Sequence, residues 1–177
     1  MIMKLEVFII KKIKTLELWG CIFTIILGTL FHFAYEAINQ WRPLAFFFPI
    51  NESVWEHLKM SFWPFIFFGI IEAFILKSRI SNIIVSKTFG IYTSIVLIVG
   101  VHYLYRSIVG HPVVVADIIL FITSIIIGYL VSYRVLIKKH LSTSLKLLSY
   151  FLILMLAFMI IYFTYYPPDF FLFISGS

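Results

Sequence analysis

The sequence predicts an all-α fold: a polytopic transmembrane bundle of about five membrane-spanning helices, with the N-terminus inside. Three observations predict it, namely a very apolar composition, repeated apolar runs long enough to cross a bilayer, and basic residues biased to one side. Of the 177 residues, 62% are hydrophobic and 12% are charged, whereas a soluble domain carries about 25% charged residues. A soluble fold of this size cannot bury that much apolar surface. Lipid must therefore cover it, and the lipid bilayer is the expected partner.

Five apolar runs meet the length that a crossing requires. About 20 apolar residues span the roughly 30 Å hydrocarbon core, and a helix satisfies its own backbone hydrogen bonds in lipid. A membrane β-barrel needs alternating apolar and polar residues, and runs such as ILMLAFMIIYF do not alternate. The chain is expected to form one transmembrane domain over residues 1–177, with spans at about 17–38, 53–76, 88–109, 112–136 and 145–166.

The basic residues predict the orientation. With the N-terminus inside, the inner segments hold eleven Lys and Arg residues, and the outer segments hold Arg42, Lys59 and Arg106. Since Lys and Arg concentrate in cytoplasmic loops, we expect a protein of the cell membrane with its C-terminus outside. The net charge of +6 is then a topology signal and does not indicate nucleic-acid binding. Segment 44–50 is too short to span, but it could enter the membrane as a re-entrant or interfacial piece.

Ionisable side chains gather at the predicted outer ends of the spans. Residues four apart share a helix face, which pairs His32 with Glu36 and His102 with Arg106. An ionised group in mid-membrane costs about 2.5–3.5 kcal/mol even on the lenient insertion scale. Such groups persist when they pair, face water or bind a ligand, so this outer layer is where a functional site is expected. Its members are His32, Glu36, Glu56, His57, His102, Arg106 and Asp117.

Histidines with carboxylates suit Zn²⁺, which keeps an open position for water in catalytic sites. The metal lowers the pKa of that water and makes a hydroxide near neutral pH, while the remaining charged groups act as bases or orient the ligands. A metal-dependent hydrolase of lipid-like substrates is the first hypothesis, although the sequence has no H-E-x-x-H motif. The expected metal ligands are His32, His57 and His102, and the expected catalytic residues are Glu36, Glu56, Asp117 and Arg106.

Other functions remain open at this point. Without a metal, the same histidines could carry protons near neutral pH, as in an isomerase, a proton-coupled transporter or a subunit that captures a small solute. A structural polar cluster in a non-catalytic membrane partner is a third hypothesis. The sequence contains no G-x-S-x-G, S-x-x-K, Walker or dinucleotide-binding motif, and a single cysteine, Cys21, excludes an internal disulfide.

The inner halves of the spans are predicted to be almost free of charge. Glu72 is the exception, since it lies 16 residues after Glu56, or about 24 Å along a helix. We expect Glu72 to pair with Lys77 or Arg79 at the inner end. The shortage of inner charge argues against a path for ions through the bundle.

One segment carries a resemblance. The run PINESVWEHLKMSFWP from Pro49 to Pro64 contains an N-E-S-x-W-E-H-x-K motif. It resembles the signature of an uncharacterised family of bacterial multi-pass membrane proteins, and His32 and Glu36 in HFAYE extend the likeness upstream. The resemblance implies a bacterial membrane location and no mechanism. The His32–Glu36 spacing is also similar to the helical H-x-x-x-E pair of the emopamil-binding sterol isomerase group, which implies isomerase chemistry at these two residues alone.

Overall fold

The computed structural model describes residues 2–77, 80–138 and 141–175. Over these ranges the chain forms five long α-helices and no strand, and each helix is long and apolar enough to cross a membrane. The predicted all-α bundle of five spans is therefore confirmed. The long helices are α1 (Ile2–Ala37), α2 (Val54–Leu76), α3 (Ile80–Val109), α4 (Val114–Leu136) and α5 (Thr143–Tyr165), with the short 3₁₀ helices η1 (Arg42–Leu44) and η3 (Phe171–Phe173).

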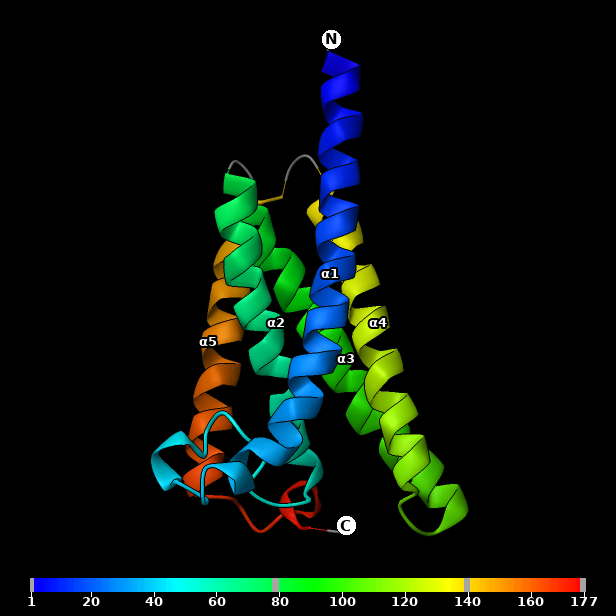
Figure 1. Cartoon of the computed structure of the whole chain (residues 1–177), viewed down its shortest axis with the longest axis vertical. Coiled ribbons are helices and arrows are strands. Elements are labelled where there is room, and N and C mark those ends of the chain that lie inside the picture. Colours follow the sequence, from blue (N-terminus) through cyan, green and yellow to red (C-terminus); the bar gives the residue numbers. More distant parts are fainter. Residues whose placement is uncertain (1, 78–79, 139–140, 176–177) are drawn as a thin grey trace.

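The helices run alternately in opposite directions, and the two termini lie at opposite ends of the bundle (Figure 1). We call these the N-terminal end and the C-terminal end. The helices α3 and α4 pack along each other, α1 contacts α2 and α4, and α5 contacts α3. Toward the C-terminal end, the hairpin of α3 and α4 diverges from α1 (Figure 1). The bundle thus presents two separate groups of helix ends there.

Two helices begin earlier than their apolar runs predict. Helix α1 starts at Ile2 and α3 at Ile80, whereas the spans were expected from 17 and 88. Lysines end an apolar run, but they are good helix formers and do not end a helix. With 36 residues, α1 is about 54 Å long, longer than the roughly 30 Å hydrocarbon core. Its first turns accordingly extend beyond the other helices (Figure 1).

Aromatic and β-branched side chains fill the centre. Phe65 of α2 is fully buried and stacks on Tyr129 of α4, with 4.1 Å between the ring centroids. Glycines allow α3 and α4 to approach closely, since a Cβ added at Gly90 would lie 2.8 Å from the carbonyl oxygen of Gly128. Small residues at such contacts are typical of helix packing in membranes.

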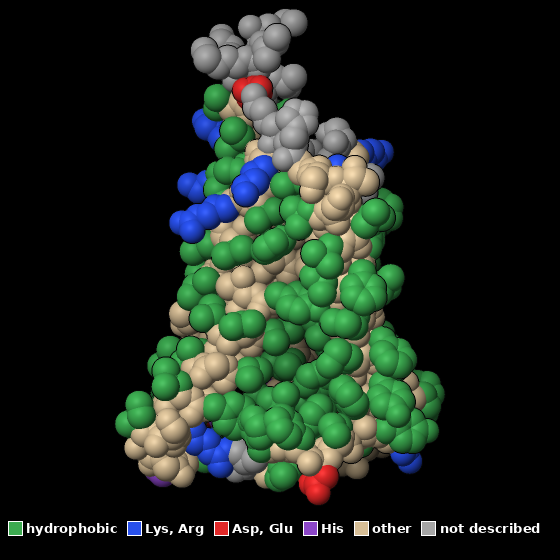
Figure 2. Space-filling view, turned by 180° about the vertical axis from the view of Figure 1, so that it is seen from behind, with side chains coloured by type: hydrophobic (Ala, Val, Ile, Leu, Met, Phe, Trp, Pro, Cys, Tyr) green, Lys and Arg blue, Asp and Glu red, His purple; other side chains and the backbone are tan. Residues whose placement is uncertain are grey.

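The surface fits a lipid environment. In Figure 2 hydrophobic side chains cover the middle of the visible face, and Lys and Arg gather toward the end from which α1 emerges. Large apolar side chains are exposed along several helices, among them Leu30, Ile108 and Leu154. Water would make such a surface an aggregation hazard, whereas lipid covers it without penalty.

Side chains of the segment Pro49–Pro64 hold the loop before α2 against that helix. Lys59, which is fully buried, donates hydrogen bonds to the carbonyl oxygens of Ala45 at 3.0 Å and Phe48 at 3.2 Å, and pairs with Glu56. The indole of Trp63 donates to the carbonyl oxygen of Phe46 at 2.7 Å. Segment 44–50 therefore packs along the first turns of α2, as an interfacial or re-entrant piece does.

Candidate functional site

Three potential metal ligands meet where α1 ends and α2 begins. His32 lies near the end of α1, Glu52 lies in the turn before α2, and His57 lies in the first turns of α2. Their ligand atoms, one from each residue, all lie within 4.8 Å of one another. The two imidazole rings have their centroids 5.3 Å apart. The structure thus brings together two of the three predicted metal-binding histidines and adds Glu52 to them.

Local hydrogen bonds place Glu52 and His57 on one side of the turn. The side-chain oxygen of Asn51 accepts from the backbone N–H of Ser53 at 2.9 Å, and the Ser53 hydroxyl accepts from the N–H of Glu56 at 3.3 Å. Ser53 is therefore the N-cap of α2. This cap fixes the path of the chain into the helix, and His57 Nε2 comes to 3.4 Å from Glu52 Oε2.

The hydrogen bonds of His57 favour a cation at this point. Its Nδ1 lies 2.8 Å from the carbonyl oxygen of Ser53; a carbonyl only accepts, so Nδ1 carries the hydrogen. A neutral ring would then direct the Nε2 lone pair toward the Glu52 carboxylate, which is unfavourable. A proton on Nε2 or a metal ion between the two atoms removes this repulsion. Metal-binding histidines usually donate their other N–H to such a carbonyl or carboxylate.

His32 completes the group from the other helix. Its Nδ1 is buried and has no hydrogen-bond partner among the described residues. A buried polar atom without a partner costs free energy, so an unsatisfied imidazole nitrogen beside a second histidine and a carboxylate is a sign of a ligand site. The group of His32, Glu52 and His57 is called the histidine–glutamate site below.

A second constellation lies at the C-terminal end, on the hairpin of α3 and α4. His102 Nδ1 is 2.8 Å from Asp117 Oδ1, which also accepts a hydrogen bond from the Tyr105 hydroxyl at 2.7 Å. The Tyr105 oxygen accepts from the backbone N–H of Val113 at 3.2 Å. His102 therefore pairs with Asp117 in the structure and is not part of the histidine–glutamate site. Its role as a metal ligand stays a prediction.

The other predicted catalytic residues lie around these two groups. Glu56 is buried, and its carboxylate accepts from Lys59 and from the backbone N–H of Ile50 at 2.9 Å. Glu36 is exposed on α1, one turn beyond His32, and Arg106 is half-buried on α3, one turn beyond His102. Glu56 has a structural role, because its carboxylate links the loop before α2 to the helix through Ile50 and Lys59.

A cluster of charged side chains that was not predicted lies toward the N-terminal end of the bundle. Glu72 Oε2 lies 2.7 Å from Lys87 Nζ, and Glu17 Oε2 lies 2.9 Å from the same nitrogen. Glu72 was expected to pair with Lys77 or Arg79, but its ion-pair partner is Lys87. Arg79 lies outside the described residues. The helix halves that were predicted to lie on the inner side are also not nearly free of charge. Lys87 interrupts the apolar run IIVSKTFGIY, and that interruption was the available signal.

Residues 5–176 match the model of a family described as a family of unknown function, DUF6512. The chain belongs to this family. No curated protein and no solved structure matches it. Both the histidine–glutamate site and the buried charges of Glu17, Glu72 and Lys87 lie within the part that the DUF6512 model covers.

The histidine–glutamate site of this DUF6512 chain offers two imidazole nitrogens and one carboxylate oxygen. Two histidines and a glutamate are a donor set that catalytic zinc sites use, with the fourth position left to water. The members come from α1, from the turn before α2 and from α2 itself, so a bound ion would also join the two helices. These features make it the best candidate for a functional centre in the described part of the chain.

Proposed function

We propose that this membrane protein binds one Zn²⁺ ion at His32, Glu52 and His57 and uses it to hydrolyse a lipid-like substrate at the outer face of the membrane. The observation that carries the proposal is the convergence of these three side chains, with ligand atoms within 4.8 Å of one another. No other group of three or more such ligands within that distance is found over residues 2–77, 80–138 and 141–175.

The distances support a metal of this size. With metal–ligand bonds of about 2.0–2.1 Å in a tetrahedral site, two ligand atoms lie about 3.3 Å apart. His57 Nε2 and Glu52 Oε2 are already 3.4 Å apart. The remaining approach needs only side-chain motion, and Glu52 is free to move because 70% of its side chain is exposed.

The surroundings support hydrolysis of an amphipathic molecule. A zinc-bound water with its pKa lowered to about 7 supplies a hydroxide at neutral pH. Glu36 lies one turn beyond His32, and helix neighbours at this spacing have Cβ atoms about 5–6 Å apart, so we assign it the role of general base. Leu30 and Phe33 are 58% and 62% exposed beside His32 on α1. They provide an apolar surface for the acyl part of a lipid next to the polar site.

Metal content tests the proposal. We expect the protein purified in detergent to retain about one Zn²⁺ per chain after dialysis, and His32→Ala or His57→Ala to lose it, because two ligands hold zinc far more weakly than three. His111→Ala is the matched control, since His111 lies on an exposed turn and contacts the carbonyl oxygen of Pro112. Metal-free wild type, or equal zinc in all three variants, would reject the site.

An activity assay tests the second part of the proposal, the hydrolysis of a lipid-like substrate. Wild type reconstituted in liposomes should hydrolyse a fluorogenic phospholipid or acylglycerol ester in a zinc-dependent manner. Glu36→Gln should retain zinc while the rate falls by about 10²–10⁴, the usual contribution of a general base. Zinc retained without hydrolysis of any ester would mean that the ion is structural. Zinc-stimulated solute uptake in place of hydrolysis would identify a transporter.

A further inference from the structure

A buried cluster of charges joins four helices near the N-terminal end of the bundle. Lys87 of α3 lies between Glu17 of α1 and Glu72 of α2, at 2.9 and 2.7 Å. Ser132 of α4 donates to Glu17 Oε1 at 2.8 Å and accepts from Lys87 Nζ at 3.2 Å. No more than 4% of the three charged side chains is exposed. We call Glu17, Glu72 and Lys87 the buried triad.

The triad is distinct from the histidine–glutamate site. Glu72 follows His57 by 15 residues on the same helix, which is about 22 Å. The α2 helix therefore carries one ionisable site at each end. An inference about the triad does not depend on the proposed zinc chemistry.

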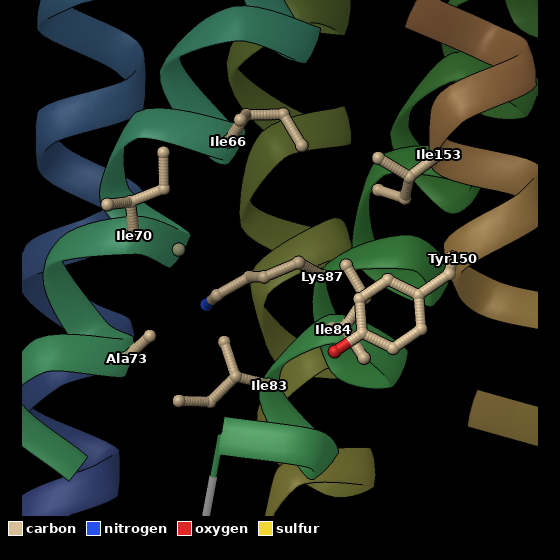
Figure 3. A pocket seen from close by; sticks show the side chains of 9 residues that line it. Ile66, Ile70, Ala73, Ile83, Ile84, Lys87, Tyr150 and Ile153 are labelled. Atoms are coloured by element: carbon tan, nitrogen blue, oxygen red, sulfur yellow. The ribbon is translucent and has the colours of Figure 1, made fainter. Parts of the chain in front are cut away.

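The amine of Lys87 is separated from lipid by its own stem. Figure 3 shows the side chain running from α3 toward Ile70 and Ala73 of α2, with its nitrogen pointing away from Tyr150 and Ile84. The stem lines a cavity of about 230 Å³ whose other lining residues are uncharged. A Cβ added at Gly69 would lie 3.1 Å from Lys87 Cγ, so the stem fits closely against α2.

The charges of the triad do not balance. Two carboxylates and one ammonium leave a net charge of −1 if all are ionised, and an uncompensated charge inside a membrane protein is costly. Of the other titratable side chains around the triad, Cys21 on α1, Tyr129 on α4 and Tyr150 on α5 cannot supply a positive charge. The ammonium of Lys12 on α1 is exposed and lies 3.5 Å from the carbonyl oxygen of Ile75 on α2. Tyr129 places its ring 4.8 Å from Lys87 Nζ, which stabilises the ammonium form. One further positive charge would make the triad neutral.

The two carboxylates of the triad differ in their hydrogen bonds. Glu17 accepts hydrogen bonds on both oxygens, from Lys87 and from Ser132. Glu72 is fully buried, and neither of its oxygens has a well-directed hydrogen bond to a described residue, although Oε2 is close to Lys87. A carboxylate left in this state is strongly disfavoured, whereas a protonated carboxyl is neutral and can donate.

We propose that the triad is an intramembrane proton-binding site, in which one exchangeable proton is held by the Glu17–Glu72 pair. Because the two carboxyls share one ammonium, the proton belongs to the pair. Its binding makes the contact of α1, α2 and α3 electrically neutral. Its release leaves a net charge between them, so the packing of α1 against α2 depends on proton uptake.

Infrared spectroscopy of the full chain in lipid nanodiscs tests this. The carbonyl stretch of a protonated carboxylic acid is resolved from that of carboxylates, and the chain has only 8 acidic residues. At neutral pH we expect a signal from about one protonated carboxyl per chain that shifts on exchange into D₂O. Glu72→Gln and Glu17→Gln should each abolish it, because a single carboxylate beside Lys87 is already balanced.

Two further variants, measured by the same infrared experiment, test the role of Lys87 and control for the other acidic residues. Lys87→Met should raise the signal about two-fold, because without the ammonium both buried carboxyls protonate. Asp169→Asn is the control and should leave the signal unchanged, since Asp169 is exposed at the other end of the bundle. Wild type without a protonated carboxyl signal would overturn the proposal. So would a signal that appears only when sodium is replaced by choline, because the triad would then bind a metal cation.

Discussion

Glu56 shows how a residue that resembles a catalytic acid can have a structural task. It lies beside His57 in α2, but its carboxylate accepts hydrogen bonds from the ammonium of Lys59 and from the backbone N–H of Ile50. Both side chains of the pair are almost fully buried. A buried pair contributes little net stability when intact, yet removal of one partner is costly because the other charge remains buried. Lys59 also holds the loop before α2 in place, because it donates hydrogen bonds to the backbone carbonyl oxygens of Ala45 and Phe48.

Lys59→Met should therefore destabilise the protein by about 3–5 kcal/mol. The change leaves Glu56 charged and buried, and it frees the carbonyl oxygens of Ala45 and Phe48. Unfolding in mixed micelles with increasing SDS measures the effect. Lys77→Met, at the exposed end of the same helix, is the control and should change stability by less than about 0.5 kcal/mol. The double variant Glu56→Gln/Lys59→Met should recover part of the loss; equal stability of both single lysine variants would contradict this account.

At the residue scale, the sequence predicted the site only in part. His32 and His57 were identified because both fall at the same end of the predicted spans. Glu52 was not among the predicted site residues, since its approach to His57 depends on the turn that Asn51 and Ser53 form. Glu17 and Lys87 are 70 positions apart, and hydropathy does not reveal the relative rotation of two helices. Their pairing could not be predicted without the packing.

At the scale of elements, hydropathy predicted all five helices but misplaced two starts. It began the third span only after Lys87, at residue 88, because a charged residue is typical of a loop. In the structure Lys87 lies well inside α3 and is neutralised by α1 and α2. The ends of α2, α4 and α5 were predicted closely, because capping residues or prolines mark them. Contacts between helices depend on small residues that hydropathy does not single out. Gly90 and Gly128, where α3 and α4 approach closely, are examples.

Gly90→Ala should destabilise the contact of α3 with α4. The added methyl group would lie 2.8 Å from the Gly128 carbonyl oxygen and 3.2 Å from a carbon of Phe65, and such overpacking costs about 1–3 kcal/mol. Gly100→Ala on the same helix is the matched control, because no described atom outside its own turn lies within 4 Å of its added carbon. It should be neutral or stabilising, since alanine is the better helix former. Unfolding of both variants in mixed micelles provides the comparison, and a stable Gly90→Ala variant would contradict the close contact.

At the scale of the whole molecule, the charges favour one orientation even after the buried lysines are set aside. Lys87 was counted among eleven inner basic residues and Lys59 among three outer ones, but both are inside the bundle. Without them the count is ten against two, so the bias persists. The termini lie at opposite ends (Figure 1), as an odd number of spans requires. The positive-inside rule therefore predicts that the end with the histidine–glutamate site is the outer one.

Full-length fusions at each terminus test this orientation. A fluorescent protein that folds only in the cytoplasm should fluoresce when joined before Met1, and alkaline phosphatase, which is active only outside the bacterial cytoplasm, should be active when joined after Ser177. The physical reason is the excess of Lys and Arg at the N-terminal end, which the positive-inside rule retains in the cytoplasm. The converse fusions are the controls and should be silent. Both termini on one side would mean that one helix does not cross, and a full inversion would place His32, Glu52 and His57 in the cytoplasm, where extracellular lipids could not be their substrates.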